Sequence, residues 1–240
     1  MRSWAAPGRH RKPRSAVPAL VAAGTAAVAV AAVIAGCSSS DPLASSTARQ
    51  IASEAAGNLQ TSGGFTVTGK VTGTAAGDVN LTVEPGKGCE GNITQPGKGR
   101  IGLVIAGNQA WIQPTRQWLV KETGQAEGSQ LAASIGNRLV SGLLTPASLG
   151  GTCTVASMTR PVTSAKNLAK KPRTSIDGQD VIPLRAGART WYVTDTPDPK
   201  IVQISGTGRG AKSDARITYH PVTVTPPAAN DTISAAQAGL

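Results

Sequence analysis

The stretch Phe65-Thr-Val-Thr-Gly-Lys-Val-Thr72, followed by Asp78-Val-Asn-Leu-Thr-Val-Glu84, decides the fold class. In both runs apolar residues alternate with polar ones, so the hydrophobic period is two residues. This period places the apolar side chains on one face of a strand and the polar side chains on the other. Strands with one buried and one solvated face are typical of antiparallel sheets. The sequence therefore predicts two half-buried antiparallel strands here.

Further short strands are predicted along most of the chain. Turn-forming residues separate them, as at Pro85-Gly86-Lys87-Gly88 and at Pro197-Asp198-Pro199. The predicted strands cover residues 89–94, 101–105, 110–113, 116–121, 181–184, 191–194, 201–205 and 216–219. The pattern is that of a meander.

Two segments have helical spacing instead. The first runs from residue 46 to Ser62-Gly63-Gly64, with apolar residues every four positions at Ile51, Ala55 and Leu59. The second has the same spacing before Thr145-Pro146. Its apolar positions are Leu131, Ile135, Leu139 and Leu143. Each segment predicts an amphipathic helix with one apolar stripe.

These elements predict an α+β domain over residues 46–227. Its core is a large, curved, unclosed antiparallel sheet, a half-barrel whose concave face is covered by the helices. Tightly fitting helices would give a filled core, whereas helices held apart would leave an apolar cavity, and both arrangements stay open. Residues 37–45 are small and polar and predict a flexible tether, and residues 228–240 predict a loosely held tail.

The N-terminus has the pattern of an export signal. Five basic residues and no acidic residue occur before position 15, and Ala16–Gly36 carries no charge. The signal ends in Ile34-Ala35-Gly36-Cys37, which resembles a bacterial lipobox. Cleavage is expected between Gly36 and Cys37, with diacylglycerol on the Cys37 thiol, since two acyl chains hold a protein stably at a membrane. The alternative is an uncleaved membrane-spanning anchor at 16–36. Both readings place the remainder on the extracytoplasmic face of the cell membrane.

Two cysteines remain after Cys37, namely Cys89 and Cys153. Disulfides persist outside the cytoplasm, so an even remainder of two predicts one bridge between them. Two separate buried thiols are the alternative.

Basic residues exceed acidic ones, with a formal net charge of +11 for the whole chain. Outside the signal they are spread out, except for a cluster of Lys166, Lys170, Lys171 and Arg173. This cluster either contacts anionic lipid or wall polymer or forms a solvated loop. Nucleic acid is not an expected partner, because aromatic residues are scarce, no reading motif is present and the chain is exported.

Catalytic motifs are absent from the sequence. Gly86-Lys87-Gly88-Cys89-Glu90-Gly91 matches a dinucleotide-binding pattern by letters only, because it leads into a predicted strand and not into a helix. His220 is the single histidine after the signal, which makes a histidine metal centre or a Ser-His-acid triad hard to assemble. We therefore expect no enzyme activity, no cofactor and no metal, and a surface role for His220.

The domain resembles a known family. The resemblance rests on Phe65–Gly69, the Leu81–Cys89–Gly91 segment, Ile101–Trp111, the central helix, Ile176–Leu184, Trp191–Val193, Pro197–Pro199 and the closing Pro221–Pro226. In these segments the chain resembles actinobacterial envelope lipoproteins related to LprG and LppX, which have the half-open barrel of LolA and LolB. The resemblance implies a cavity between sheet and helices that carries acylated lipids or glycolipids, and it implies no catalytic residues.

The expected function is therefore a lipid-anchored, monomeric envelope protein that binds or carries an apolar, lipid-like or glycolipid-like ligand. Its partners are the cytoplasmic membrane, through Cys37, and that ligand. The alternative is an envelope scaffold, or a module that binds a protein or wall polymer, with a filled core. Candidate cavity-lining residues, each of which could also be ordinary core, are Ile101, Leu103, Ile105, Trp111, Trp118, Tyr192 and Ile201.

Overall fold

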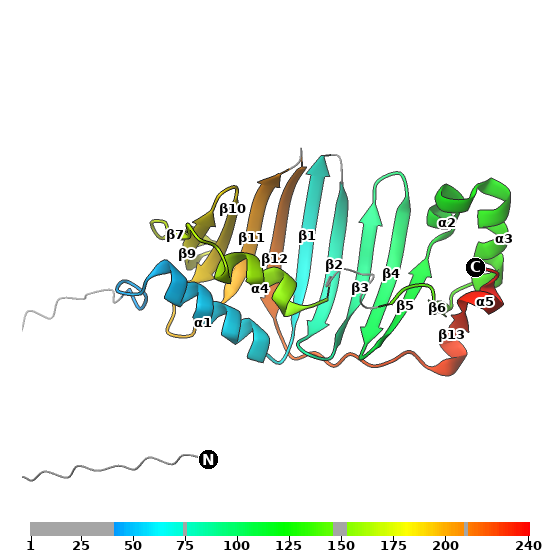
Figure 1. Cartoon of the computed structure of the whole chain (residues 1–240), viewed down its shortest axis with the longest axis horizontal. Helices are drawn as coiled ribbons and strands as arrows, with labels where there is room; N and C mark the ends of the chain where they lie inside the picture. The colour runs from blue at the N-terminus through cyan, green and yellow to red at the C-terminus, as the bar shows by residue number, and fades with distance from the viewer. Residues whose placement is uncertain (1–40, 74–75, 146–152, 209–210) are drawn as a thin grey trace, which may run out of the picture. The chain divides into compact units, whose positions relative to one another are not determined.

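The computed structural model describes residues 41–240 except 74–75, 146–152 and 209–210 (Figure 1). The chain divides into Met1–Ser39 and a compact unit, Ser40–Leu240, and only the second is described below. The predicted signal at 1–36, its cleavage after Gly36 and the lipidation of Cys37 lie outside the described residues.

The described residues form one sheet of 13 strands. Its path runs β13-β6-β5-β4-β3-β2-β1-β12-β11-β10-β9-β7, and β8 pairs with β9 beside it. The strands are β1 (Phe65–Gly73), β2 (Gly77–Glu84), β3 (Gly88–Gln95), β4 (Gly99–Ala106), β5 (Gln109–Pro114), β6 (Leu139–Ser141), β7 (Ala169–Lys170), β8 (Thr174–Ile176), β9 (Gln179–Ala186), β10 (Arg189–Thr194), β11 (Ile201–Gly208), β12 (Ala211–Tyr219) and β13 (Thr232–Ser234).

The first and last strands of this path do not pair with each other, so the sheet stays open. All neighbours are antiparallel except β13 and β6, which are parallel. The predicted α+β class with an unclosed half-barrel sheet is confirmed. The prediction of a purely antiparallel sheet is wrong at this one edge.

Strand register shows which side chains share a face. Phe65 pairs with Val83 and with Tyr219, and Val67 pairs with Leu81 and with Ile217. Directly opposed residues point to the same side of a sheet, so these apolar side chains form one continuous concave face. The alternate residues, rich in Thr, Lys and Asp, form the convex face.

Five α-helices and one short 3-10 helix accompany the described part of the sheet. They are α1 (Ala48–Thr61), α2 (Arg116–Thr123), α3 (Gln125–Ile135), α4 (Val155–Thr163), η1 (Ala229–Asp231) and α5 (Ala235–Ala238). Helix α1 starts with a capping box, in which Thr47 and Gln50 satisfy each other's backbone N–H groups. It buries the predicted stripe of Ile51, Ala55 and Leu59.

The helices cover the concave face in two groups (Figure 1). Helix α1 packs against α4 and against β10 and β11, whereas α2 packs against α3 and β4 at the other end of the sheet. Under α1 the core is filled, since Phe65, Trp191 and Ile201 are 0–1% exposed. This end of the sheet therefore has the packing of an ordinary core.

Three predicted elements differ in the structure. Residues 116–121 form helix α2 and not a strand, because the Thr115 side chain caps the N–H of Trp118. The second predicted helix ends at Ile135, because Gly136 adopts a φ of 61° there, and Leu139 already lies in β6. Helix α4 was not predicted at all.

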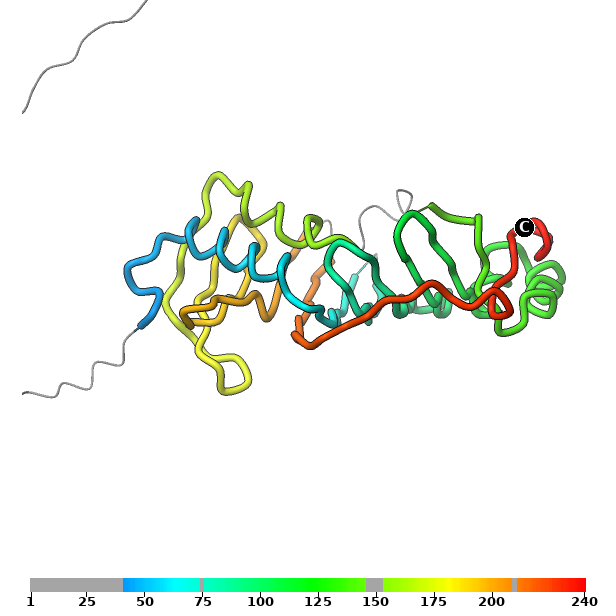
Figure 2. The backbone as a smooth tube through the Cα atoms, turned by 90° about the horizontal axis from the view of Figure 1, so that it is seen from below, coloured from blue at the N-terminus to red at the C-terminus, as the bar shows by residue number. Residues whose placement is uncertain are grey.

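Two segments expected to be loose are held in place. The end of the predicted tether is fixed, because Leu43 is only 4% exposed. In the predicted loose tail, Ile233 is 6% exposed and opposes Val140 across the parallel β13–β6 pair. Residues 220–231 lead along one edge of the sheet to this pair (Figure 2). Both segments are held because each buries an apolar side chain, Leu43 in the first and Ile233 in the second.

Candidate functional site

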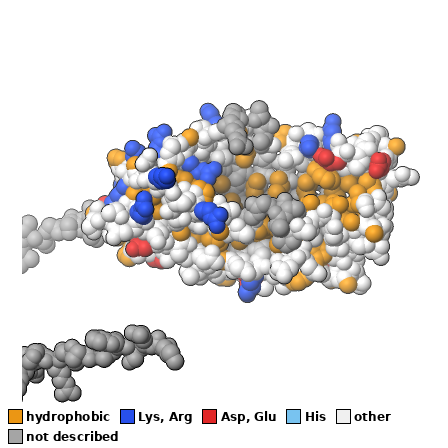
Figure 3. Space-filling view, in the orientation of Figure 1, with side chains coloured by type: hydrophobic (Ala, Val, Ile, Leu, Met, Phe, Trp, Pro, Cys, Tyr) orange, Lys and Arg blue, Asp and Glu red, His pale blue; other side chains and the backbone are white. Residues whose placement is uncertain are grey.

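An apolar strip of the concave face, over β2 to β4, lies between the two helix groups. Figure 3 shows hydrophobic side chains gathered there, between the part that carries α4 and the part that carries α2 and α3. Val79, Ile93 and Ile101 oppose one another across β2, β3 and β4. Each is only partly buried, in contrast to the core under α1. We call this surface the apolar strip.

Gly91 leaves a gap in the floor of the apolar strip. It lies between Leu81 and Leu103, and its φ of 147° belongs to the region that favours glycine. A Cβ atom here would lie 2.0 Å from the carbonyl oxygen of Asn80. The close backbone approach therefore requires glycine, and the floor has no side chain at this point.

A cavity of about 270 Å³ lies at the turn end of the apolar strip. Its apolar wall includes Ile105 from β4 and Val155 from α4, and polar groups at its rim include Gln60 and Lys87. The complete lining is Gln60, Gly86, Lys87, Gly88, Ile105, Gly107, Cys153, Thr154, Val155 and Ala156. This mixture of apolar walls and a few polar groups is typical of small-molecule sites.

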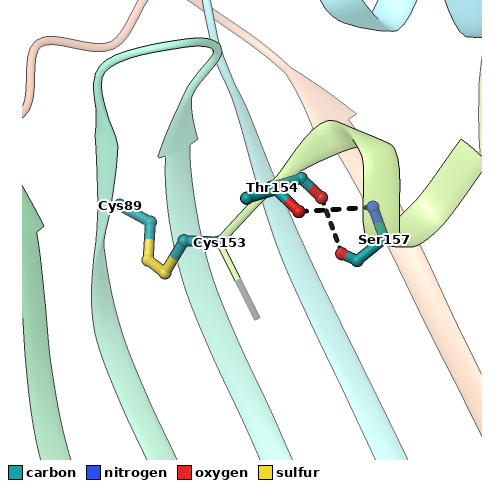
Figure 4. Close-up of a disulfide and its surroundings, with 4 residues drawn as sticks. All are labelled: Cys89, Cys153, Thr154 and Ser157. Carbon is teal, nitrogen blue, oxygen red and sulfur yellow. Dashed lines mark hydrogen bonds between the residues drawn. A yellow bond between two sulfur atoms is a disulfide. The ribbon is translucent and has the colours of Figure 1, made fainter. Parts of the chain in front are cut away.

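A disulfide fixes the wall of this cavity (Figure 4). Cys89 in β3 is bonded to Cys153, two residues before α4, as expected from the sequence. The hydroxyl of Thr154 then accepts a hydrogen bond from the N–H of Ser157 at 3.3 Å, and the Ser157 hydroxyl donates to the Thr154 carbonyl at 2.6 Å. The bridge therefore holds the start of α4 on the concave side of β3.

Lys87 at the cavity rim is paired with Glu84. The ammonium group lies 2.5 Å from the carboxylate, and the backbone N–H of Val224 donates to the other carboxylate oxygen at 2.8 Å. The hydrogen bond from Lys87 and then the one from Val224 lower the pKa of Glu84 below its ordinary value. The rim thus carries a fixed ion pair.

The structure brings together three of the predicted cavity residues. Ile101, Leu103 and Ile105 lie on the concave face of β4. Ile105 lines the cavity, and the other two lie in the floor of the apolar strip. Ile201 shares the concave face but is 0% exposed in the filled core, at the end of the sheet where α1 packs on β11.

The other three candidates lie elsewhere. Trp111 and Tyr192 are on the convex face, because their neighbours Ala110 and Trp191 occupy the concave face. Trp111 borders a separate cavity, of about 530 Å³, together with Pro226 and Pro227. Trp118 belongs to α2, where it packs partly buried against the core. The prediction that these three line the cavity on the apolar face of the sheet is therefore wrong for Trp111 and Tyr192, which face the other side, and for Trp118, which is not in a strand.

Sequence reasoning missed the α4 wall. Its signal was present, because Val155, Thr159 and Val162 have helical spacing after the capping residue Thr154. Pro161 lies inside this segment, and because proline disfavours a helix interior, the sequence did not predict a helix here. Gln60 at the end of α1 gave no signal for a role at the rim.

Two further features concern the described ranges as a whole. Within them, no group of three or more His, Cys, Asp or Glu side chains could hold a metal ion. None of the helices between residues 41 and 240 that the structure describes is long and apolar enough to cross a membrane. His220 is exposed, and its Nε2 lies 2.7 Å from the hydroxyl of Thr66.

Solved structures share this architecture, although a scan of protein-family models and a search of curated proteins find no match. LprF from Mycobacterium bovis has a TM-score of 0.54 at 15% identity, with 75% of this chain and 97% of LprF aligned. The lipoprotein LppX from Mycobacterium tuberculosis has a TM-score of 0.48 at 10% identity, over 74% of this chain and 98% of LppX. A LolA superfamily protein from Nitrosomonas europaea has a TM-score of 0.33 at 11% identity, over 75% of this chain and 95% of that one. The likeness to LprF shows that this chain has the LprF type of fold, as the sequence resemblance implied.

Proposed function

We propose that this protein is a lipid-anchored envelope protein that binds an apolar, lipid-like ligand in the apolar strip and the cavity at its end. The anchor would be diacylglycerol on Cys37, on the extracytoplasmic side of the cell membrane. The lipobox-like sequence supports the anchor, and the open concave face supports the ligand site.

One observation carries the ligand proposal. The same sheet is closed by tightly packed side chains under α1, yet it leaves Val79, Ile93 and Ile101 only partly buried over β2 to β4. Sequences rarely leave several neighbouring apolar side chains accessible unless something covers them. The scaffold alternative needs a filled core over the whole sheet, and the partly buried Val79, Ile93 and Ile101 interrupt that core over β2 to β4.

The chemistry of the lining indicates the class of ligand. The cavity walls offer Ile105, Val155 and the disulfide, and the rim cation Lys87 is already paired with Glu84. Such a site favours an alkyl chain over a charged group. Burying an acyl chain would contribute about 25 cal/mol per Å² before ordering costs are subtracted.

The cavity size limits how much of a ligand it holds. At about 270 Å³ it lies just below the range of about 300–1,000 Å³ typical of ligand pockets. It is therefore suited to one chain, with the remainder of the ligand along the apolar strip.

The test is native mass spectrometry and lipid extraction of the full chain purified from its natural host. We expect a co-purifying lipid, and a mature N-terminus at Cys37 that carries acyl chains. Ala156→Trp would place an indole in the cavity, because Ala156 is an exposed residue of the lining. It should reduce the amount of bound lipid strongly.

Ala133→Trp is the matched control, since Ala133 is an exposed alanine on α3, outside the cavity lining. It should leave lipid binding unchanged. A wild-type protein that carries no lipid, or equal lipid content in both tryptophan variants, would contradict the proposed site. An unacylated Cys37 would contradict the anchor separately.

A further inference from the structure

The N-terminal segment 41–46 is bound to the folded unit by a defined set of contacts. The N–H of Leu43 donates to the carboxylate of Asp195 at 3.3 Å, and the Leu43 side chain is buried. The ammonium group of Lys170 donates to the carbonyl oxygens of Leu43, Ala44 and Ser46 at 2.5, 3.1 and 3.4 Å. One side chain thus donates to three carbonyl oxygens of this segment.

Arg173 completes this arrangement by ion pairs. Its guanidinium group lies 3.3 Å from the carboxylate of Asp41 and 3.4 Å from that of Asp180, and it also pairs with Asp195. The Asp195 side chain is fully buried. We call Asp41, Lys170, Arg173 and Asp195 the clamp. Two members of the basic cluster recognised in the sequence therefore hold the N-terminal segment.

The clamp determines which end of the unit is near the proposed anchor. Asp41 lies four positions after Cys37 along the chain. A fully extended chain spans at most about 3.6 Å per residue, so the two positions are at most about 14 Å apart. If Cys37 is acylated, a step that rests on the proposed function, the clamp and its surroundings must lie close to the membrane surface.

The surface beside the clamp is strongly basic. Residues 155–176, from α4 through β8, contain five basic residues and no acidic residue. Arg160, Lys166 and Lys171 from this stretch are exposed and take part in none of the ion pairs of the described residues. Figure 3 shows Lys and Arg side chains gathered over the part of the unit that carries α1 and α4.

We propose that Arg160, Lys166 and Lys171 form a contact surface for an anionic phospholipid membrane. The clamp would bring this surface to the bilayer, so that the unit is oriented on the membrane and does not swing freely from its anchor. The partner follows from the short connection to Cys37 and from charge complementarity. Each cation near an anionic bilayer strengthens binding by about fivefold, and salt weakens the effect.

The experiment uses residues 40–240, which form a compact unit with its own core and lack Cys37. Flotation measures its binding to phosphatidylcholine vesicles with and without phosphatidylglycerol at low ionic strength. We expect binding only to the anionic vesicles. The triple variant Arg160→Gln, Lys166→Gln, Lys171→Gln should bind at least about tenfold more weakly.

A second triple variant, Arg100→Gln, Lys121→Gln, Lys212→Gln, is the matched control. These cations are also exposed and outside every ion pair of the described residues, and they lie on β4, α2 and β12. Both triple variants lose three positive charges, so they differ only in where the charges were removed. The control keeps Arg160, Lys166 and Lys171 and should therefore still bind anionic vesicles.

Three results would overturn the proposal: no binding to anionic vesicles, equal loss in the two triples, or binding to an anionic wall polymer in place of vesicles. Circular dichroism shows whether each triple remains folded. The outcome is independent of the ligand and anchor tests above, because the fragment has neither Cys37 nor a requirement for bound lipid.

Discussion

Glu84, the last residue of β2, accepts a hydrogen bond from the backbone N–H of Val224 at 2.8 Å, across 140 residues of sequence. Val224 belongs to the segment that leads from β12 to β13 along the edge of the sheet (Figure 2). A second bond, from the N–H of Val222 to the carbonyl of Gly63, holds the same segment. These contacts direct the chain to β6, where β13 adds the final strand.

Replacing Glu84 should therefore loosen the C-terminal segment. Glu84→Leu leaves the buried N–H of Val224 without an acceptor, which destabilises the fold. Glu84→Gln keeps an amide oxygen for Val224 and should destabilise less. The measurement is the urea midpoint of both variants, together with hydrogen exchange at residues 222–234. Equal effects of Leu and Gln would show that the bond to Val224 contributes little.

The same carboxylate predicts a pH dependence. Lys87 and Val224 lower the pKa of Glu84, so the folded protein binds this proton less readily than the unfolded chain. Its contribution to stability is fully present above the unfolded value of about 4.3 and is lost as the pH falls through the lowered pKa of the folded state. Urea midpoints measured at and below that value should fall more steeply for the wild type than for Glu84→Gln. Parallel curves would contradict the assignment.

The sheet could be predicted from sequence because its information is local. The alternation of apolar and polar residues around Val67 and Leu81 indicates which face is buried, and the turn residues indicate where strands end. The β13–β6 pair could not be predicted in this way, because three residues are too few to show a period and the partners are 93 positions apart, as for Ile233 and Val140. The segment that connects β12 to β13 is held by the bond between Glu84 and the distant Val224, which no local pattern shows.

The candidate site was less predictable for a related reason. The cysteine count and the expected export were sufficient to predict the Cys89–Cys153 bridge, but the sequence did not show which of the candidate cavity residues share the concave face. Trp111 and Tyr192 have convex positions, which only the register reveals. The clamp could not be predicted from the sequence either, because Asp41, Lys170 and Asp195 are brought together by the fold and share no motif.

Removing the disulfide should destabilise the protein and free α4 in particular. The bridge closes a loop of 64 residues, for which the chain-entropy model gives a contribution of about 4 kcal/mol. The double variant Cys89→Ala, Cys153→Ala should lose about this amount in urea unfolding. Hydrogen exchange should increase in α4 more than in α3, which has no link to the bridge. A uniform increase across both helices would contradict a local role for the bridge.

Two isoleucines on the concave face should respond differently to truncation. Ile201 is 0% exposed in the filled core, so Ile201→Ala should cost about 2–5 kcal/mol of stability. Ile101 is partly buried in the apolar strip, so Ile101→Ala should cost less in stability and should reduce lipid binding instead. Urea unfolding and lipid extraction measure the two effects. If both variants lose the same stability and neither loses lipid, the distinction between core and apolar strip is wrong.

The clamp makes its own prediction about residues 41–46. Lys170→Met removes the donors to three carbonyl oxygens while it keeps an alkyl stem of similar length. The neighbouring Lys171 is exposed and contacts none of them, so Lys171→Met is a control with the same change of charge. Hydrogen exchange of 41–46 should accelerate in the Lys170 variant and stay slow in the control. Global stability should change little in either variant, because the segment lies at the edge of the unit. Equal protection in both would mean that the Asp195 and Arg173 contacts suffice to hold the segment, and the same exchange measurement on Asp195→Asn would then be the decisive comparison.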